Sequence, residues 1–316
     1  MEGEQKDNQI SKTLYFFNLA LLLGVVGMIF LIDQKFEQRK ENIVKAEQEV
    51  KSLAVFNNLN LRAKAAFVYD VLEDRILYRK NEKEQLPIAS ITKLMTALVA
   101  TELLPKNSNI TIKSDFLKEE GDSGLLSAES WELMDLLDFS LVTSSNDGMR
   151  SVASVIGAVT SNTSDYDLGR KDFIEKMNLK AKDMELEQTF FVNETGLDVD
   201  TKVSGGYSSA QNVSDLMKYL ILKHPEILEA TKYQKLSINS DDRKHNAKNT
   251  NDIVNEIPGL FASKTGFTDM AGGNLVIAFD PSIGRPIIIT VLGSTLEGRF
   301  SDMEALVKAS LDYIAE

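Results

Sequence analysis

The sequence contains no cysteine and only two histidines among its 316 residues. The absence of cysteine excludes disulfides, thiolate nucleophiles and cysteine-ligated metal clusters. His224 and His245 leave few ligands for a zinc site and little scope for a Ser-His-Asp triad. Any chemistry must therefore use serine, lysine, aspartate or glutamate side chains.

The chain also has no excess of basic residues. It is acidic, with 47 acidic and 35 basic residues and a formal net charge of −12. We therefore expect no nucleic-acid partner, since phosphate binding requires a basic face. Hydrophobic residues make up 43% of the chain and charged residues 26%, which is typical of a globular protein with room for a large core.

One long apolar run stands near the N-terminus, from Leu14 to Ile32. As a helix with a rise of about 1.5 Å per residue it would be roughly 28 Å long, close to the thickness of a bilayer's hydrocarbon core. The run ends in large residues, which favours an uncleaved anchor over a signal peptide with its small-x-small cleavage site. We expect a cytoplasmic tail over residues 1–12 and a transmembrane anchor over 13–32.

Residues 33–60 are rich in Glu, Lys and Gln and predict a helical stalk. Apolar residues recur there every seven positions, but a charged residue breaks the second seam, so a single solvated helix is favoured over a dimerising coiled coil. The oligomeric state stays open. The composition changes at Leu61, and we expect one catalytic domain over residues 61–316.

The domain sequence predicts strands at both of its ends and helices between them. The segments "AAFVYDV" and "RILYRKN" predict a strand pair, and a long helical region follows from Ser90 to about Lys182. Near the end, "GGNLVIAFD" and "RPIIITVLGS" predict a hairpin, and residues 299–316 predict an amphipathic helix. This order indicates an α/β (α+β) class, with a sheet assembled from distant segments and a helical insert.

The first candidate for chemistry is the pair Ser90 and Lys93 in "PIASITKLMTALVA". Residues three apart on a helix lie on one face, within reach of a hydrogen bond. Lysine can take the proton of a serine hydroxyl only when it is neutral, which requires burial or a neighbouring positive charge. The apolar surroundings of Lys93 predict that burial, although such pairs more often are a helix cap and a solvated lysine.

Two further segments carry polar side chains at suggestive spacings. In "SKTGFT", Lys264 and Thr265 could hold a carboxylate, and Gly266 would let a substrate backbone lie close to a strand. In "VTSSNDG", Ser144 and Asn146 follow an apolar helix pattern and could pass a proton and hold an amide. The pattern alone does not distinguish this second pair from the serine and asparagine of "KLSINS", which have the same spacing.

In their order, these elements resemble the S-x-x-K, S-x-N and K-T-G motifs of the penicillin-recognising serine enzymes. More narrowly, residues 61–316 resemble the D-alanyl-D-alanine carboxypeptidases of the low-molecular-weight penicillin-binding proteins. The likeness extends to "LLDFSLVTSSNDG", "DFIEKMNLKAKDMELEQTFFVNETGLD" and "YSSAQNVSDLMKYLI". It implies a β-lactamase/transpeptidase-like fold, with an antiparallel sheet flanked by helices and an all-helical subdomain, and it assigns S-x-N to Ser144 and Asn146.

The resemblance also implies roles for the catalytic residues. Ser90 would attack the carbonyl of the penultimate D-alanine, with Lys93 as general base. Ser144 would relay the proton to the departing D-alanine, and Asn146 would hydrogen-bond the peptide stem. Water would then hydrolyse the acyl-enzyme without a metal or cofactor.

Binding of the substrate would fall to the K-T-G segment. Lys264 and Thr265 would bind the terminal carboxylate, and the backbone N–H groups of Ser90 and Phe267 would hold the oxyanion. The positive charge of Lys264 would help to keep Lys93 neutral. The expected partners are peptidoglycan stem peptides and β-lactams.

The sequence departs from the family at several points. Ser263 stands where the family usually has an apolar residue, and Phe267 where it often has a small or polar one. The family commonly continues into a β-rich domain with an amphipathic membrane helix, whose place we expect the N-terminal span to take. Because the implied substrate lies outside the cytoplasmic membrane, residues 33–316 are expected on the external side.

Several alternatives stay open on the same fold. A class A β-lactamase would need a glutamate between the second and third motifs to activate the deacylating water. Glu185, Glu187 and Glu194 lie in that interval, but we expect them to be surface acids. Endopeptidase or transpeptidase action would use the same residues. A catalytically silent wall-binding scaffold is disfavoured, because it would need no matched nucleophile and base.

Overall fold

A computed structural model of the chain describes residues 27–28, 31–36, 38–40, 54–121 and 124–315. The chain divides into two compact units, Met1–Ala54 and Val55–Glu316. In the first unit, the described residues up to 40 are helical and exposed. None of the helices in the described part of the chain is long and apolar enough to cross a membrane. The predicted tail, most of the predicted anchor and residues 41–53 of the predicted stalk lie outside the described residues.

The second unit is built on a five-stranded antiparallel sheet with the strand order β10-β11-β12-β1-β2. Its strands are β1 (Ala65–Asp70), β2 (Arg75–Lys80), β10 (Leu260–Thr268), β11 (Gly272–Phe279) and β12 (Ile287–Ser294). Strands β1 and β12 lie side by side, with Ala65 opposite Leu292. The predicted strand pair, the predicted hairpin and the assembly of the sheet from distant segments are therefore confirmed.

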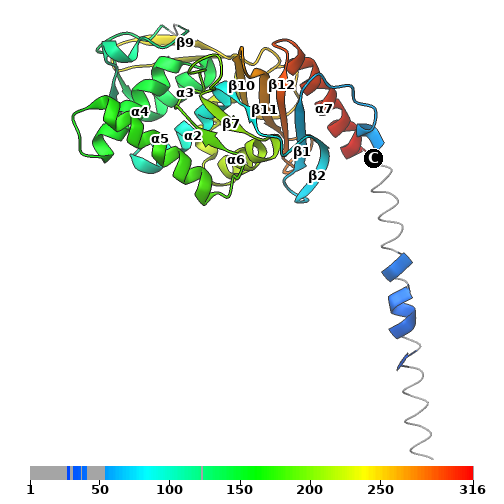
Figure 1. The fold of residues 1–316 in the computed structure, drawn as a ribbon. Coiled ribbons are helices and arrows are strands. Elements are labelled where there is room, and N and C mark those ends of the chain that lie inside the picture. Colours follow the sequence, from blue (N-terminus) through cyan, green and yellow to red (C-terminus); the bar gives the residue numbers. More distant parts are fainter. Residues whose placement is uncertain (1–26, 29–30, 37, 41–53, 122–123, 316) are drawn as a thin grey trace, which may run out of the picture. The chain divides into compact units, whose positions relative to one another are not determined.

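Helices cover both faces of this sheet. The helix α6 (Ala210–Lys223) packs on one face and α7 (Gly298–Ala315), the predicted closing helix, packs on the other (Figure 1). Because both faces are covered, β11 and β12 are buried along nearly their whole length. This explains why both strands are almost continuously apolar rather than alternating.

A mainly helical region lies between β2 and β10 in the sequence and beside the sheet in space (Figure 1). Besides α6, its α-helices are α2 (Lys93–Leu103), α3 (Leu133–Thr143), α4 (Asn146–Thr160) and α5 (Tyr166–Asp183). Its 3₁₀ helices are η2 (Ala89–Thr92), η3 (Ser114–Phe116), η4 (Pro225–Ile227) and η5 (Glu229–Lys232), and η1 (Ala54–Phe56) precedes the sheet. Short strands complete it: β3 (Leu86–Pro87), β4 (Asn109–Thr111), β5 (Ser130–Glu132), β6 (Phe190–Phe191), β7 (Gly206–Ser208), β8 (Lys235–Asn239) and β9 (Lys244–Lys248).

Two predictions about this region are wrong in detail. The helical stretch from Ser90 to Lys182 is interrupted, and the subdomain is not all-helical, because it contains the strand pairs β4–β5 and β8–β9. The first interruption has a local cause at Pro105. The residue before a proline is disfavoured in the helical conformation, and Leu104 is extended, with φ −132° and ψ 151°. Helix α2 therefore ends there.

The helices α4 and α5 approach each other closely at a pair of glycines. A Cβ atom on Gly157 would lie 1.9 Å from the carbonyl oxygen of Gly169, and one on Gly169 would lie 2.3 Å from the backbone nitrogen of Ala158. Any larger residue would therefore push the helices apart. This contact sets the spacing of two helices whose side chains reach toward the site described below.

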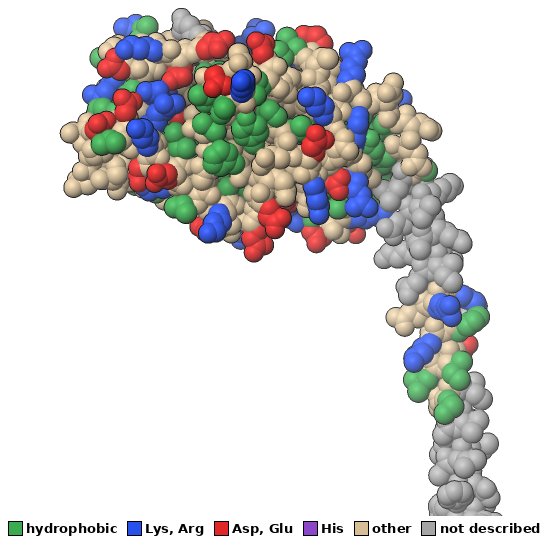
Figure 2. Space-filling view, viewed as in Figure 1, with side chains coloured by type: hydrophobic (Ala, Val, Ile, Leu, Met, Phe, Trp, Pro, Cys, Tyr) green, Lys and Arg blue, Asp and Glu red, His purple; other side chains and the backbone are tan. Residues whose placement is uncertain are grey.

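Acidic and basic side chains are interspersed over the face of the second unit that Figure 2 shows. Hydrophobic side chains gather between them near the middle of this face. That face does not carry the extended basic surface that phosphate binding requires.

Candidate active site

The S-x-x-K residues lie where a 3₁₀ helix continues into an α-helix. Ser90 belongs to η2, and Lys93 is the first residue of α2. The predicted helix start at Ser90 is thus a 3₁₀ turn, and Ala89 before it has a left-handed φ of 48°. This conformation is strained for a residue with a side chain. The spacing still brings the Ser90 Oγ and the Lys93 Nζ to 2.7 Å, as predicted.

Lys93 is completely buried and has three oxygen neighbours. Besides the Ser90 hydroxyl, its Nζ donates to the Asn146 Oδ1 at 2.6 Å and to the Thr195 carbonyl at 2.8 Å. The last two oxygens can only accept hydrogen bonds, whereas a hydroxyl can also donate. The arrangement therefore leaves the Ser90 hydroxyl as the partner that can give a proton to a neutral amine.

The surroundings of Lys93 favour that neutral form. Burial lowers the pKa of Lys93 to about 7, against the opposing effect of the carboxylates of Glu194 and Glu119. The pKa of Lys264 is also lowered, first by burial and then by the nearby charges of Lys93 and Arg299. The charge of Lys93 thus disfavours protonation of Lys264. The reverse effect, in which Lys264 keeps Lys93 neutral, stays a prediction.

The second and third motifs meet at a second serine–lysine contact. Ser144 lies between α3 and α4. Its backbone has a left-handed φ of 61°, and α3 ends at this residue. Its Oγ accepts a hydrogen bond of 2.9 Å from the Nζ of the buried Lys264 on β10. The structure therefore brings together the serine and lysine of both pairs, although Ser144 and Lys264 are 120 residues apart.

Asn146 has a different set of contacts from the one the sequence suggested. Its Oδ1 accepts from Lys93, and its Nδ2 donates to the Glu120 carbonyl at 2.6 Å. Both ends of the side-chain amide are thus engaged by the protein. In this structure Asn146 contacts the lysine, and the second N–H of its Nδ2 can still donate to a peptide stem, so its expected role in binding the stem stays a prediction.

The K-T-G segment lies in a strand, β10, which is at the edge of the sheet. A Cβ on Gly266 would lie 2.6 Å from the Ile88 carbonyl oxygen and 3.2 Å from the Ser90 backbone nitrogen. Only glycine therefore allows β10 to pass this close to the nucleophile. The Thr265 and Thr250 hydroxyls are hydrogen-bonded at 2.5 Å. Phe267, the next residue after Gly266, is 44% exposed.

Ser263 before this segment faces the protein. Its Oγ donates to the Thr231 carbonyl at 3.0 Å, and its backbone N–H donates to the Thr231 hydroxyl at 3.1 Å. The departure from the apolar residue usual in the family therefore ties β10 to η5.

A cavity of about 550 Å³ opens beside Phe267. Its lining combines apolar and acidic side chains and includes Leu197, Met270, Glu120, Asp198, Asp200 and Asp269. The cavity therefore continues the site past the end of β10.

Sequence reasoning missed Arg299. This buried residue of α7 donates from Nη1 to the Gly266 carbonyl at 3.1 Å and holds the edge strand from behind. Its position on the apolar side of the closing helix could have pointed to it. The Thr195 carbonyl could not have been found from the sequence, because every residue has a backbone carbonyl.

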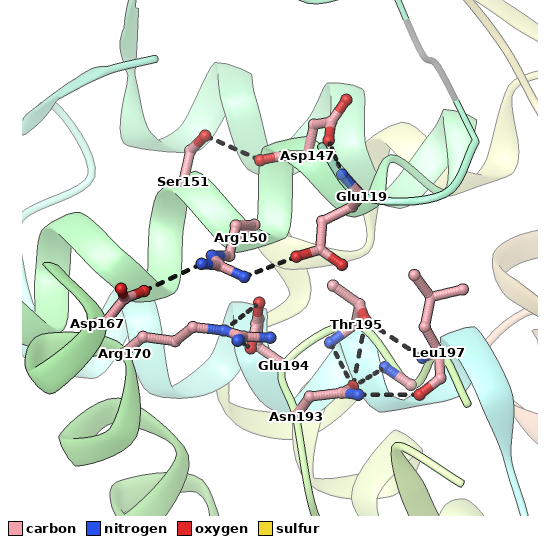
Figure 3. Close-up of polar contacts among 11 residues, drawn as sticks. Glu119, Asp147, Arg150, Ser151, Asp167, Arg170, Asn193, Glu194, Thr195 and Leu197 are labelled. Atoms are coloured by element: carbon pink, nitrogen blue, oxygen red, sulfur yellow. Dashed lines mark hydrogen bonds and ion pairs between the residues drawn. The ribbon is translucent and has the colours of Figure 1, made fainter. Parts of the chain in front are cut away.

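The other sequence candidates lie elsewhere. Ser237 is on β8 and contacts Asn246 of the neighbouring strand β9, so the "KLSINS" serine is not part of the site. Glu185 and Glu187 are exposed, as expected. The expectation that Glu194 is a surface acid is wrong, since it is fully buried and ion-paired with Arg170 (Figure 3).

A serine beside a buried lysine, with a second serine–lysine pair at the edge strand, defines a serine acyl-transfer site on a mixed α/β fold. The model of the S11 peptidase family, D-alanyl-D-alanine carboxypeptidase, matches residues 51–295. The chain belongs to this family.

Individual relatives agree with this assignment. The chain is 30% identical to the D-alanyl-D-alanine carboxypeptidase DacF of Bacillus subtilis over 258 residues, which cover 79% of this chain and 61% of DacF. It is also 30% identical to a D-alanyl-D-alanine endopeptidase of Haemophilus influenzae, over 68% of this chain and 69% of that protein. Penicillin-binding protein D2 of Listeria monocytogenes, solved in its ampicillin-bound form, superposes with a TM-score of 0.67 at 32% identity. The match covers 80% of this chain and 98% of that one.

Proposed function

We propose that this chain is a serine D-alanyl-D-alanine carboxypeptidase that removes the terminal D-alanine of peptidoglycan stem peptides through an acyl-enzyme at Ser90. The observation that carries the proposal is the contact of 2.7 Å between the Ser90 hydroxyl and the buried Lys93 amine. Membership of the family and the name of the DacF relative support the substrate class.

In the proposed reaction, Ser90 Oγ forms a bond to the carbonyl carbon of the penultimate D-alanine, and its proton passes to the Lys93 amine. The bond to the terminal D-alanine breaks, and the leaving nitrogen takes a proton through the Ser144 hydroxyl. Water then attacks the ester, releases the shortened peptide and restores the Ser90 hydroxyl. The proton that Lys93 receives passes on to the leaving nitrogen, and the attacking water gives a proton to Ser90 Oγ, so both side chains return to their starting forms.

Substrate binding in this proposal uses the end of β10. Lys264 and Thr265 would hold the terminal carboxylate through charge-assisted hydrogen bonds. The backbone N–H groups of Ser90 and Phe267 would stabilise the oxyanion, and each such donor typically contributes about 10²–10³ in rate. The close approach of Gly266 to the Ser90 nitrogen supports this placement.

The test is covalent labelling of the full-length chain with a fluorescent penicillin. We expect labelling of the wild type and its loss in Ser90→Ala, because the hydroxyl forms the ester. Lys93→Ala should lower the labelling rate by about 10³-fold or more, since the base is lost. Ser237→Ala, which changes an exposed hairpin serine, is the matched control and should label normally. Undiminished labelling of Ser90→Ala would refute the assignment.

Endopeptidase activity is the second candidate, because the Haemophilus influenzae relative bears that name. Release of free D-alanine from a pentapeptide supports the carboxypeptidase, and cleavage of a cross-linked peptide dimer supports the endopeptidase. A β-lactamase would instead turn penicillin over rapidly. Both carboxylate oxygens of Glu194 accept from Arg170, so this glutamate is not free to activate a deacylating water, which favours a long-lived adduct over such turnover.

We also propose that residues 13–32 anchor the chain in the cytoplasmic membrane and that residues 33–316 lie outside it. The support is the uncharged run from Leu14 to Ile32 in the sequence. The external side follows from the proposed substrate, which is part of the cell wall.

A further inference from the structure

A buried ion pair anchors the loop whose Thr195 carbonyl accepts from Lys93. Glu194 is 0% exposed, and its two carboxylate oxygens accept from the Nε of Arg170 on α5, at 3.0 and 2.8 Å (Figure 3). The Glu194 carbonyl accepts from the Thr96 hydroxyl at 2.7 Å, and Thr96 lies one turn after Lys93 on α2. Glu194 therefore links α5 and α2 immediately before the carbonyl that contacts the lysine.

The same loop has little freedom to shift. Asn193 Oδ1 accepts from the backbone N–H groups of Thr195 at 3.2 Å and Gly196 at 2.7 Å (Figure 3). Gly196 has a φ of +81°, and a Cβ there would lie 1.9 Å from the Ala89 carbonyl oxygen. The loop thus packs directly on the backbone that precedes Ser90.

Stability alone does not explain an ion pair at this position. Taking charges out of water costs several kcal/mol per ion in general, and well-packed apolar residues of similar volume are often as stable or more so. The pair does, however, fix the loop next to the base. We propose that Arg170 and Glu194 position Lys93 for catalysis: they hold the Thr195 carbonyl against its amine and place a negative charge behind it. This inference rests on the proposed acylation of Ser90.

Charged groups face Lys93 and its neighbours from several elements. The carboxylates of Glu194 and Glu119 both raise the pKa of Lys93 against burial. The basic groups around them come from three different elements: the guanidinium groups of Arg170 on α5 and Arg150 on α4, and the amine of Lys264 on β10, whose pKa is lowered by burial. Glu119 pairs with Arg150 at 2.7 Å and lies on a separate segment after η3. Glu194 thus acts on Lys93 in two ways: its charge raises the pKa of Lys93, and it is bonded in the chain to Thr195, whose carbonyl accepts from Lys93.

The test is Glu194→Gln in the full-length chain, with the acylation rate by fluorescent penicillin measured from about pH 5 to about pH 9. Glutamine keeps the shape and removes the charge, so protonated Lys93 is less stabilised. We expect the acid limb of the profile to move to lower pH by about half a unit to one unit. An acid limb that stays in place overturns the inference.

Asp70→Asn is the matched control. Asp70 is 0% exposed and pairs with Arg285, which is 24% exposed, at 2.8 Å; the exposures of Glu194 and Arg170 are the same. This pair lies at the end of β1, beside the turn between β11 and β12. We expect Asp70→Asn to lower stability without moving the acid limb. An equal shift in this control would mean general loosening and would overturn the inference.

A second variant covers the case in which Glu194→Gln does not fold. Arg170→Gln changes the partly exposed member of the pair, and its acylation rate at about pH 6 is expected to fall at least about threefold, because the carboxylate loses its anchor. An unchanged rate overturns the inference.

If the wild type is not labelled at any pH, the proposed function itself fails. A labelled wild type with an unmoved limb in Glu194→Gln overturns only the role of the ion pair.

Discussion

Lys93 uses the same three contacts in both of its protonation states. As an ammonium it donates to the Ser90 hydroxyl, the Asn146 Oδ1 and the Thr195 carbonyl. As a neutral amine it keeps the last two bonds and turns its lone pair toward the serine, whose hydroxyl then donates. The proton can therefore pass from serine to lysine without a change of side-chain position, which is the preorganisation that general-base catalysis needs.

The pH dependence of acylation follows from this residue. The pKa of Lys93 is lowered to about 7, and only the neutral amine can accept the serine proton. The rate of penicillin acylation should therefore be half-maximal near pH 7 and fall about tenfold per unit at lower pH. Stopped-flow labelling across the pH range measures it, with the folded fraction checked by circular dichroism. A flat profile from about pH 5 to about pH 9 would contradict the assignment of Lys93 as base.

At the scale of elements, α3 carries a destabilising carboxyl close to the serine at its end. Asp138 is partly buried, and among the described residues its Oδ1 has no hydrogen-bond partner. Burial, together with the smaller effect of the nearby charges of Asp135 and Glu229, raises the pKa of Asp138 to about 7. The folded chain therefore resists ionisation of this group, whereas the unfolded chain ionises it at its ordinary pKa.

This yields a prediction for Asp138→Asn. A group whose pKa is raised on folding binds its proton more tightly in the folded state, so stability falls as the pH rises from the ordinary value toward 7. Asparagine removes this loss. The free energy of unfolding of the variant, relative to the wild type, should increase by roughly 1–3 kcal/mol between about pH 5 and about pH 8.5.

Urea unfolding at the two pH values measures this difference. Asp312→Asn, at an exposed aspartate on α7, is the control and should show no comparable change. A relative stability of Asp138→Asn that does not depend on pH would show that Asp138 ionises normally in the folded chain.

At the scale of the whole molecule, the chain joins a unit of residues 55–316 with the fold of a serine peptidase to an N-terminal segment with an apolar run. A soluble substrate would need no such segment. The proposed substrate is part of the cell wall, so an anchor would keep the enzyme at the membrane surface where wall precursors emerge.

Deletion of residues 1–32 tests the anchor. The full-length chain should sediment with membranes and resist extraction by alkaline carbonate, because a spanning helix is held by its buried apolar surface. The shortened chain should stay in the supernatant and keep its labelling by fluorescent penicillin. Mass spectrometry of the full-length product should find the N-terminal segment intact. A mature chain that begins after the apolar run would show a cleaved signal peptide instead.

Much of the fold could be predicted because local patterns carry it. The strands β1 and β2, the hairpin β11–β12 and the helix α7 follow from runs of apolar residues and from turn residues between them. The closeness of Ser90 and Lys93 follows from helical spacing. The strands β4 and β5 could not be predicted in this way, because each has only three residues and is stabilised by pairing with the other.

The side chains of the candidate site could be predicted from the sequence, but the contacts that hold them in place could not. The resemblance to a known family selected Ser144 and Lys264, and the structure places them in contact. Glu194 was misjudged, because a glutamate in a polar segment predicts an exposed position. Its burial depends on Arg170, which lies on a different helix and which no local pattern connects to it.

The sequence by itself determined which side chains are available for chemistry, because the lack of cysteine and the scarcity of histidine leave serine, lysine, aspartate and glutamate. It also determined that Ser90 and Lys93 lie within reach of a hydrogen bond, because they are three residues apart on one helical turn. The tertiary structure decided which groups surround the buried Lys93: its backbone carbonyl partner, Thr195, comes from 102 residues away, and its pKa is lowered to about 7. The reason is physical: desolvation and long-range charge act through packing, which depends on segments that are distant in the chain.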